Sequence, residues 1–247
     1  MELQRNRWSP TLYQTFLEEL KSLAEEDYRK FRIKILKAPT PILGIRQPLL
    51  KKLSAQILKG NALSFLEIPK GPYFEEQMIH GYVLAKIPLP YQQKKKLIFD
   101  FLEAMDNWSI CDDFVSALKP FVFKNQVEFL NDISPLAEDS NPWKVRFLLV
   151  VLLQCYLGQD SLTNTLSLCR QIHRNEYYIK MAQAWLLSMA YIRNPKEVME
   201  TLRFFEQDRF VFLKTISKII DSYRVETAQK AALKEYREQY KQLHKER

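Results

Sequence analysis

Three tryptophans recur along the chain at intervals close to the length of one two-helix repeat. Thirty-five residues separate Trp108 from Trp143, and 42 separate Trp143 from Trp185. Repeats of about 40 residues are typical of arrays in which pairs of helices stack side by side. Each tryptophan lies in a long amphipathic stretch, so such an array returns each ring at nearly the same phase. We therefore expect the rings to line one surface, as in a binding groove.

Glycine is scarce, and helix-start signals are frequent. The chain has 5 glycines among 247 residues, below the usual frequency of ~7 %, although sheets need glycine at turns and bulges. A capping residue followed by proline occurs at Ser9-Pro10, Asn141-Pro142 and Asn194-Pro195. No run alternates with period 2 for long enough to require a strand. These features predict an all-α protein.

The helical stretches follow one another through short loops, without a linker. We predict one α-solenoid domain over 1–247, with N-terminal helices in 9–37 and repeats over about 44–241. Two prolines in Ala38–Pro41 should end a basic helix over Asp27–Lys37. The other expected helices start at Ser9 and Gly44, the latter ending near Gly60, and then cover 73–86, 91–105, 107–118, 125–133, 141–156, 161–174, 176–191, 194–205, 210–223 and 226–241.

Several classes of protein are disfavoured by what the sequence lacks. The three cysteines are odd in number without CxxC spacing, and the three histidines are scattered, so neither disulfides nor a metal site are predicted. We expect no cofactor. The first residues have no apolar signal-peptide core, and the longest apolar run, Phe147–Leu153, is far short of a membrane span. A cytoplasmic protein without a membrane partner is expected.

Positive charge is concentrated towards the two ends of the chain. The net charge of +8 divides into +4 over residues 1–82, −2 over 83–165 and +6 over 166–247. Basic ends around a slightly acidic middle suit a body that grips a polyanion at its rims and keeps a carboxylate at its centre. A solvated lysine-rich surface without any partner would give the same numbers.

Trp108 and Asp112 are the first candidates for chemistry. They are four residues apart and therefore share one face of a helix, which Asn107 is expected to cap. The alternative is a core tryptophan beside a solvated carboxylate.

Trp143, Lys144 and Arg146 crowd into the first turn of a helix whose later residues are apolar. Together with the helix N-terminus they could hold a phosphate. Alternatively, the tryptophan staples the loop and Arg146 pairs with an acid such as Asp139.

Trp185 is a weaker candidate. Its apolar surroundings place it in the core, but Ala182 and Ala184 leave room for a flat ring or a sugar to approach.

In their order and spacing these stretches resemble the DNA alkylation repair family, the AlkD-like HEAT-like repeat DNA glycosylases. The resemblance extends from about Asp27 to Arg237. It implies a right-handed superhelical α-solenoid of HEAT-like helix pairs with a concave basic groove. The stretches that carry it are Leu43–Pro48, Asp106–Trp108 with Asp112, Asn141–Arg146, Glu176–Trp185, and also Lys214–Ile216 and Ser222–Arg224.

Active members of that family hydrolyse the N-glycosidic bond of cationic 3- and 7-alkylpurines, without flipping the base into a pocket. By resemblance, Trp108 and Trp185 would cradle the deoxyribose, Asp112 would face its anomeric carbon, and Arg146 would hold the adjacent phosphate. Because the base is already cationic, it leaves without a general acid and an oxocarbenium-like sugar remains. A nearby carboxylate stabilises that cation, and each aromatic face adds about 0.5–2 kcal/mol. Asp112 could also position a water.

One departure from the family pattern concerns the N-terminal region. In catalytic members a basic helix that enters the minor groove runs close up to the Leu-Gly-Ile stretch, whereas here Ala38–Pro41 intervenes. A non-catalytic duplex-binding member is therefore the alternative, and a protein-binding solenoid is the third reading. We expect a monomer that takes double-stranded DNA as its partner. The residues expected to contact DNA are Arg29, Lys30, Arg46, Gln47, Lys51, Trp143, Lys144 and Arg146.

Overall fold

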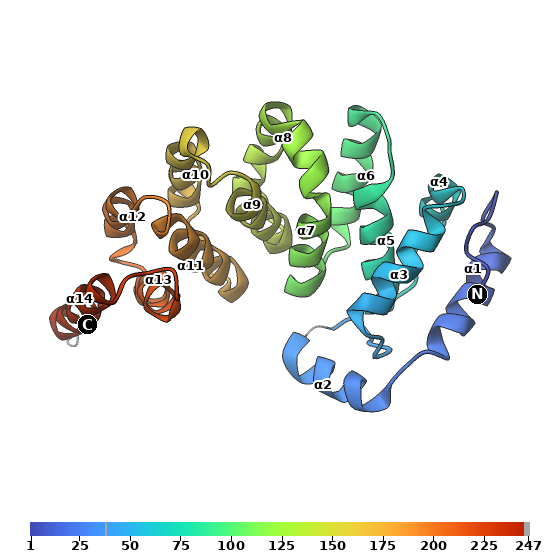
Figure 1. The fold of residues 1–247 in the computed structure, drawn as a ribbon, viewed down its shortest axis with the longest axis horizontal. Helices are drawn as coiled ribbons and strands as arrows, with labels where there is room; N and C mark the ends of the chain where they lie inside the picture. The colour runs from blue at the N-terminus through green and yellow to red at the C-terminus, as the bar shows by residue number, and fades with distance from the viewer. Residues whose placement is uncertain (38, 245–247) are drawn as a thin grey trace. The chain divides into compact units, whose positions relative to one another are not determined.

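The computed structural model describes residues 1–37 and 39–244, and this part of the chain is all-helical, as predicted (Figure 1). It contains fourteen α-helices, two short 3-10 helices and no strand. Contacts divide the chain into two compact units, one over Met1–Asn125 and one that begins at Gln126. Within each unit, helices pack against their neighbours as in an α-solenoid. The single domain over 1–247, the right-handed superhelix and the concave basic groove stay predictions.

The first unit is built around a row of three helices. Helix α5 lies between α3 and α7, and nearly all of its residues are buried. Helices α4 and α6 also pack against α5 (Figure 1). The helices of this unit are α1 (Pro10–Lys21), α2 (Glu26–Leu36), α3 (Gln47–Ile57), α4 (Ala62–Leu66), α5 (Phe74–Lys86), α6 (Tyr91–Glu103) and α7 (Trp108–Lys124).

The second unit repeats this arrangement. Helix α11 lies between α9 and α13, while α12 packs on α11 and α14 packs on α13. The elements of this unit are α8 (Gln126–Ile133), η1 (Ser134–Glu138), α9 (Pro142–Cys155), α10 (Gln159–Gln171), α11 (Tyr177–Tyr191), α12 (Pro195–Leu202), η2 (Arg203–Phe205), α13 (Arg209–Asp221) and α14 (Thr227–Leu243).

Four helices start at the capping residues that the sequence predicts. The side chains of Ser9, Asn107, Asn141 and Asn194 each accept a backbone N–H of the first turn, at 3.3, 3.0, 2.9 and 3.2 Å. These contacts satisfy N–H groups that have no partner inside the helix. The local signals thus set the register of four helices.

Two elements differ from the prediction. Helix α4 was not expected, because five residues are too few to show a periodic pattern. Helix α7 does not end at Leu118 but continues to Lys124. Pro120 lies on its exposed side, whereas Leu118 and Val122 are fully buried. Burial of that apolar stripe therefore outweighs the hydrogen bond that proline removes.

The loop before α3 is held by one buried carboxylate. Glu75, only 1 % exposed, accepts the backbone N–H groups of Leu43, Gly44 and Ile45 at 2.9, 2.8 and 3.2 Å. Gly44 has φ 95°, and a Cβ built there would lie 2.6 Å from the Glu25 carbonyl oxygen. The Leu-Gly-Ile stretch therefore lies against the start of α2, and glycine is required there.

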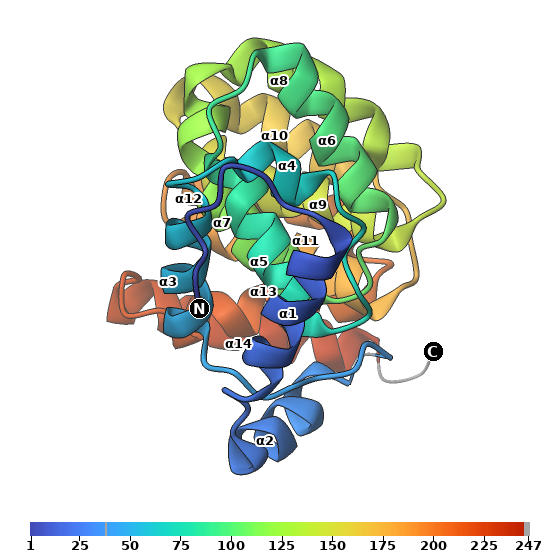
Figure 2. The same cartoon turned by 90° about the vertical axis from the view of Figure 1, so that its right-hand side faces the viewer.

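Helix α2 ends just before the segment that contains the two prolines, as the sequence predicts. Its last residue is Leu36, and Lys37 follows in the left-handed conformation with φ 48°. Ala38, part of the predicted interruption, lies outside the described residues. Thr40 donates a hydrogen bond to the Asp106 carboxylate, which ties the segment to the start of α7. In both views α2 stands apart from the row of α3, α5 and α7 (Figures 1 and 2).

Candidate functional site

The first two turns of α7 present different residues on each of their sides. Trp108 and Asp112 form one stripe, and both are partly exposed. The stripes that begin at Ile110 and Cys111 are buried in the core of the unit. The acid that the sequence singles out is therefore not sealed beneath packed side chains, and an indole lies one turn before it on the same face.

The next stripe of α7, Ser109 and Asp113, is tied to two other helices. Arg32 of α2 donates a hydrogen bond to Ser109 Oγ at 3.0 Å, and Ser109 lies 3.5 Å from Asp113 Oδ2. Gln47, the first residue of α3, donates from Nε2 to Asp113 Oδ1 and, at 2.9 Å, to the Tyr82 hydroxyl. This network fixes the rotation of α7 about its axis and with it the direction of the Trp108 and Asp112 stripe.

Sequence reasoning missed most of this network. Gln47 was expected to contact DNA, but in the free protein its amide holds Asp113. Ser109 and Asp113 repeat the four-residue spacing of the neighbouring stripe, and this spacing is the one sequence signal that could have identified them as a pair. No pattern in the sequence near Ser109 and Asp113 indicates their partners on other helices.

The Asp113 carboxylate is partly desolvated. Burial raises its pKa, the Gln47 hydrogen bond and the charge of Lys51 lower it, and the neighbouring Asp112 raises it again. Burial and the charge of Asp113 also raise the pKa of the Tyr82 hydroxyl. Two carboxylates therefore lie side by side on α7, one partly exposed and one held by donors.

The expected DNA-contacting cations of the first unit are accessible but paired. Arg29 forms an ion pair with Glu26 at 2.7 Å, and Lys30 approaches the same carboxylate at 3.9 Å. Arg46 is bound by Glu25 at 2.9 Å and lies over the Tyr28 ring. Lys51, also exposed, has its ammonium 5.6 Å from the centre of the Tyr82 ring. A phosphate would have to compete with Glu25 and Glu26 for three of these four cations.

In the second unit, the candidates at the start of α9 are more enclosed than the sequence suggests. Trp143 is partly exposed and lies 5.2 Å from the Tyr178 ring. Lys144 pairs with Asp139 at 3.3 Å. Arg146 is only 5 % exposed and donates from Nη1 to the Tyr178 carbonyl at 2.7 Å. Asp139 is thus a partner of Lys144, two positions before Arg146, with which the alternative reading had paired it.

A cluster of positive charge surrounds Arg146. Burial lowers the pKa of Lys218 on α13, and the charges of Lys214 and Arg146 lower it further, against the opposing charge of Asp221. Such mutual repulsion means that the three cations lie close together. Trp185 on α11 is partly exposed, whereas Ala182 and Ala184 beside it are buried.

The structure thus forms two groups of candidates, one in each unit. Trp108 and Asp112 share the start of α7 in the first unit. Trp143, Lys144 and Arg146 share the start of α9 in the second, where α11 carries Trp185.

A sequence model of the DNA alkylation repair enzyme family matches residues 16–207. The chain belongs to this family. The match includes the three expected catalytic residues, Trp108, Asp112 and Trp185, and also Arg146, which is expected to hold the adjacent phosphate. It ends before Lys214–Ile216, so the resemblance in the last stretches stays a prediction. No curated protein matches the chain.

Two further findings describe this family member. None of the helices in the described residues is both long and apolar enough to cross a lipid bilayer. Within the same residues, no three His, Cys, Asp or Glu side chains lie close enough to hold a metal ion.

Proposed function

We propose that this member of the DNA alkylation repair family is a DNA glycosylase for cationic 3- and 7-alkylpurines in duplex DNA. The observation that carries the proposal is the partly exposed stripe of Trp108 and Asp112, whose direction is set by the Ser109–Asp113 network. A carboxylate on a helix face is accessible to the sugar edge of a duplex, so the lesion need not enter a pocket. We therefore propose excision without base flipping.

In the proposed reaction, the bond between C1′ of the deoxyribose and the purine nitrogen breaks. Its electron pair passes to the nitrogen and neutralises the positive charge of the base, which leaves without protonation. The sugar becomes an oxocarbenium-like cation, and a water adds to C1′ and loses a proton to the solvent. The products are the free alkylpurine and an abasic site. Asp112 stabilises the sugar cation, since opposite charges a few Å apart interact strongly at a partly dry interface.

The indoles supply the second part of the mechanism. The face of an aromatic ring attracts a cation by about 0.5–2 kcal/mol, and the sugar is cationic only near the transition state. Trp108 therefore accelerates the reaction more than it strengthens binding. By the family resemblance, Trp185 of the second unit is proposed as a further contact of the deoxyribose.

The cations of both units are proposed to hold the duplex. Arg146 lies in a positive cluster with Lys214 and Lys218, which favours a phosphate nearby. Its guanidinium also donates to the Tyr178 carbonyl, which holds it in place. In the first unit Lys51 contributes directly, whereas Arg29, Lys30 and Arg46 contribute after exchanging carboxylate for phosphate.

The test is release of 7-methylguanine from methylated duplex DNA with the protein in excess over the lesion. Asp112→Asn should lower the rate about 100-fold, since loss of one electrostatic group at a reacting centre has costs of this order. Asp160→Asn, an exposed acid on α10, is the matched control and should retain the full rate. Equal rates for wild type and Asp112→Asn would reject the proposed role of Asp112.

A second candidate function is binding of duplex DNA without excision. The early end of α2 at Leu36 and the ion pairs of Arg29 and Arg46 favour it, because both weaken contact with the groove. A fluorescence titration with lesion-containing DNA, run beside the release assay, separates the two functions. Salt-dependent binding without any base release would establish the second candidate, and release would exclude it.

A further inference from the structure

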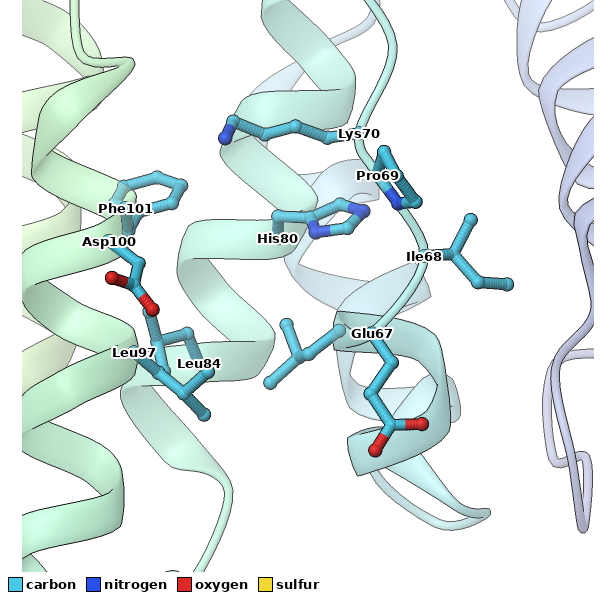
Figure 3. A pocket seen from close by; sticks show the side chains of 10 residues that line it. Glu67, Ile68, Pro69, Lys70, His80, Leu84, Leu97, Asp100 and Phe101 are labelled. Atoms are coloured by element: carbon cyan, nitrogen blue, oxygen red, sulfur yellow. The ribbon is translucent and has the colours of Figure 1, made fainter.

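A small pocket lies in the first unit, between the segment after α4 and helices α5 and α6 (Figure 3). Its volume is about 220 Å³, below the 300–1,000 Å³ typical of drug-sized ligands. Leu84, Leu97 and Phe101 provide apolar walls, and the imidazole of His80 and the side chain of Lys70 reach its edge (Figure 3). The proposed DNA site uses none of these residues.

His80 offers an unshared lone pair in this pocket. A hydroxyl has one proton, and Tyr13 donates its own to Glu76 at 2.9 Å. The proton between the Tyr13 oxygen and His80 Nε2, 3.2 Å apart, therefore belongs to the imidazole. Nδ1 is then an acceptor, and within the described residues it has no hydrogen-bond partner. The side chain is 95 % buried, and burial together with the charge of Lys70 lowers its pKa to about 3, so the ring stays neutral.

Lys70 offers a cation beside this acceptor. Its ammonium lies 5.4 Å from the centre of the Phe101 ring, and no carboxylate of the described residues pairs with it. Asp100, an acid on α6, forms an ion pair with Lys96 at 3.0 Å. Partial burial lowers the pKa of Lys70.

We propose that this pocket binds a small apolar α-amino or α-hydroxy acid. The carboxylate of the ligand pairs with the Lys70 ammonium, and its α-ammonium or α-hydroxyl group donates to His80 Nδ1. An aliphatic side chain packs against Leu84, Leu97 and Phe101. The carboxylate and the α-group of the ligand thus meet a cation and an acceptor that have no partner of that kind among the described residues.

The test is titration of the isotope-labelled full chain with L-leucine and with 2-hydroxy-4-methylpentanoate. Binding is followed by calorimetry and by the imidazole ¹⁵N resonances, which report a new donor at His80 Nδ1. We expect saturable binding of one or both compounds with a shift confined to His80 among the three histidines. The tighter of the two identifies the natural donor. Leucine amide, which lacks the carboxylate, should bind at least about tenfold more weakly.

Two variants separate this site from general effects. Lys70→Met should weaken binding at least about tenfold, as expected for a lost charge-assisted hydrogen bond. Leu97→Trp should abolish binding by filling the partly exposed apolar side. Lys52→Met, an exposed lysine on α3, is the control and should bind like the wild type. No saturable binding of either compound, or unchanged affinity in Lys70→Met, overturns the proposal. DNA excision does not enter this test, so its result is independent of the proposed function.

Discussion

The buried histidine should make the protein sensitive to acid. The pKa of His80 is about 3 in the folded protein and about 6.5 in an unfolded chain. Between these values the unfolded state binds a proton that the folded state does not, so stability rises with pH and falls as pH falls. Below about pH 6.5 the loss is about 1.4 kcal/mol per unit. From pH 7 to pH 4, His80 should remove about 3 kcal/mol from the free energy of unfolding.

The assay is urea unfolding of wild type and His80→Gln at pH 7, 6, 5 and 4. The substitution disturbs packing against Phe65, 4.5 Å away, at every pH, but it removes the titrating group. The destabilisation caused by the variant should therefore shrink by about 3 kcal/mol between pH 7 and pH 4. Tyr13→Phe keeps the imidazole and should retain the slope of the wild type. A constant difference across this range, or an NMR titration of folded His80 near pH 6.5, would refute the reasoning.

Three further predictions concern local contacts of the first unit. Gly44→Ala should lower the free energy of unfolding by about 1–3 kcal/mol, because φ 95° is strained for alanine and its Cβ meets backbone; urea unfolding measures it, and a change near zero would contradict it. Lys94→Met should cost about 1–3 kcal/mol, since the buried ammonium bonds two carbonyls at the end of α5, each at 2.9 Å; an unchanged midpoint would exclude this role. Asp113→Asn should slow base release less than Asp112→Asn does, because Asp113 only positions the helix face that carries Asp112. A larger effect of Asp113→Asn would indicate that Asp113 is the carboxylate that stabilises the sugar cation.

Local signals in the sequence predict most of the fold. They succeed where the residues that determine a helix start or end lie within one turn of it. A capping side chain such as Asn107 bonds its own helix, so its effect is readable without the partners of that helix. Helix α7 shows the limit. Its continuation past Pro120 depends on Leu118 and Val122 being buried against other helices, which overrides a local signal.

The candidate site was likewise predictable only where its residues lie within one turn of the same helix. The four-residue spacing of Trp108 and Asp112 identified the partly exposed stripe. The partners of Ser109 and Asp113 come from α2 and α3, 77 and 66 residues earlier in the chain, and no local pattern indicates such pairing. Arg146 is buried for a similar reason. Its charge suggested a surface position, but the carbonyl it bonds is supplied by Tyr178 on another helix.

The paired cations of α2 and α3 connect the fold to the choice between excision and binding. Glu25 and Glu26 hold Arg46 and Arg29 in exposed positions, where water screens an ion pair and leaves it weak. A phosphate can therefore replace these carboxylates at little cost in free energy, and the ion pairs lower the proposed affinity for DNA only modestly. The early end of α2 at Leu36 is the larger restriction on the proposed groove contact, because the basic helix that lies against the Leu-Gly-Ile loop stops there. Arg32 of the same helix donates to Ser109, in the network that sets the direction of the Trp108 and Asp112 stripe. Helix α2 therefore bears on both the proposed contact with DNA and the proposed chemistry at Asp112.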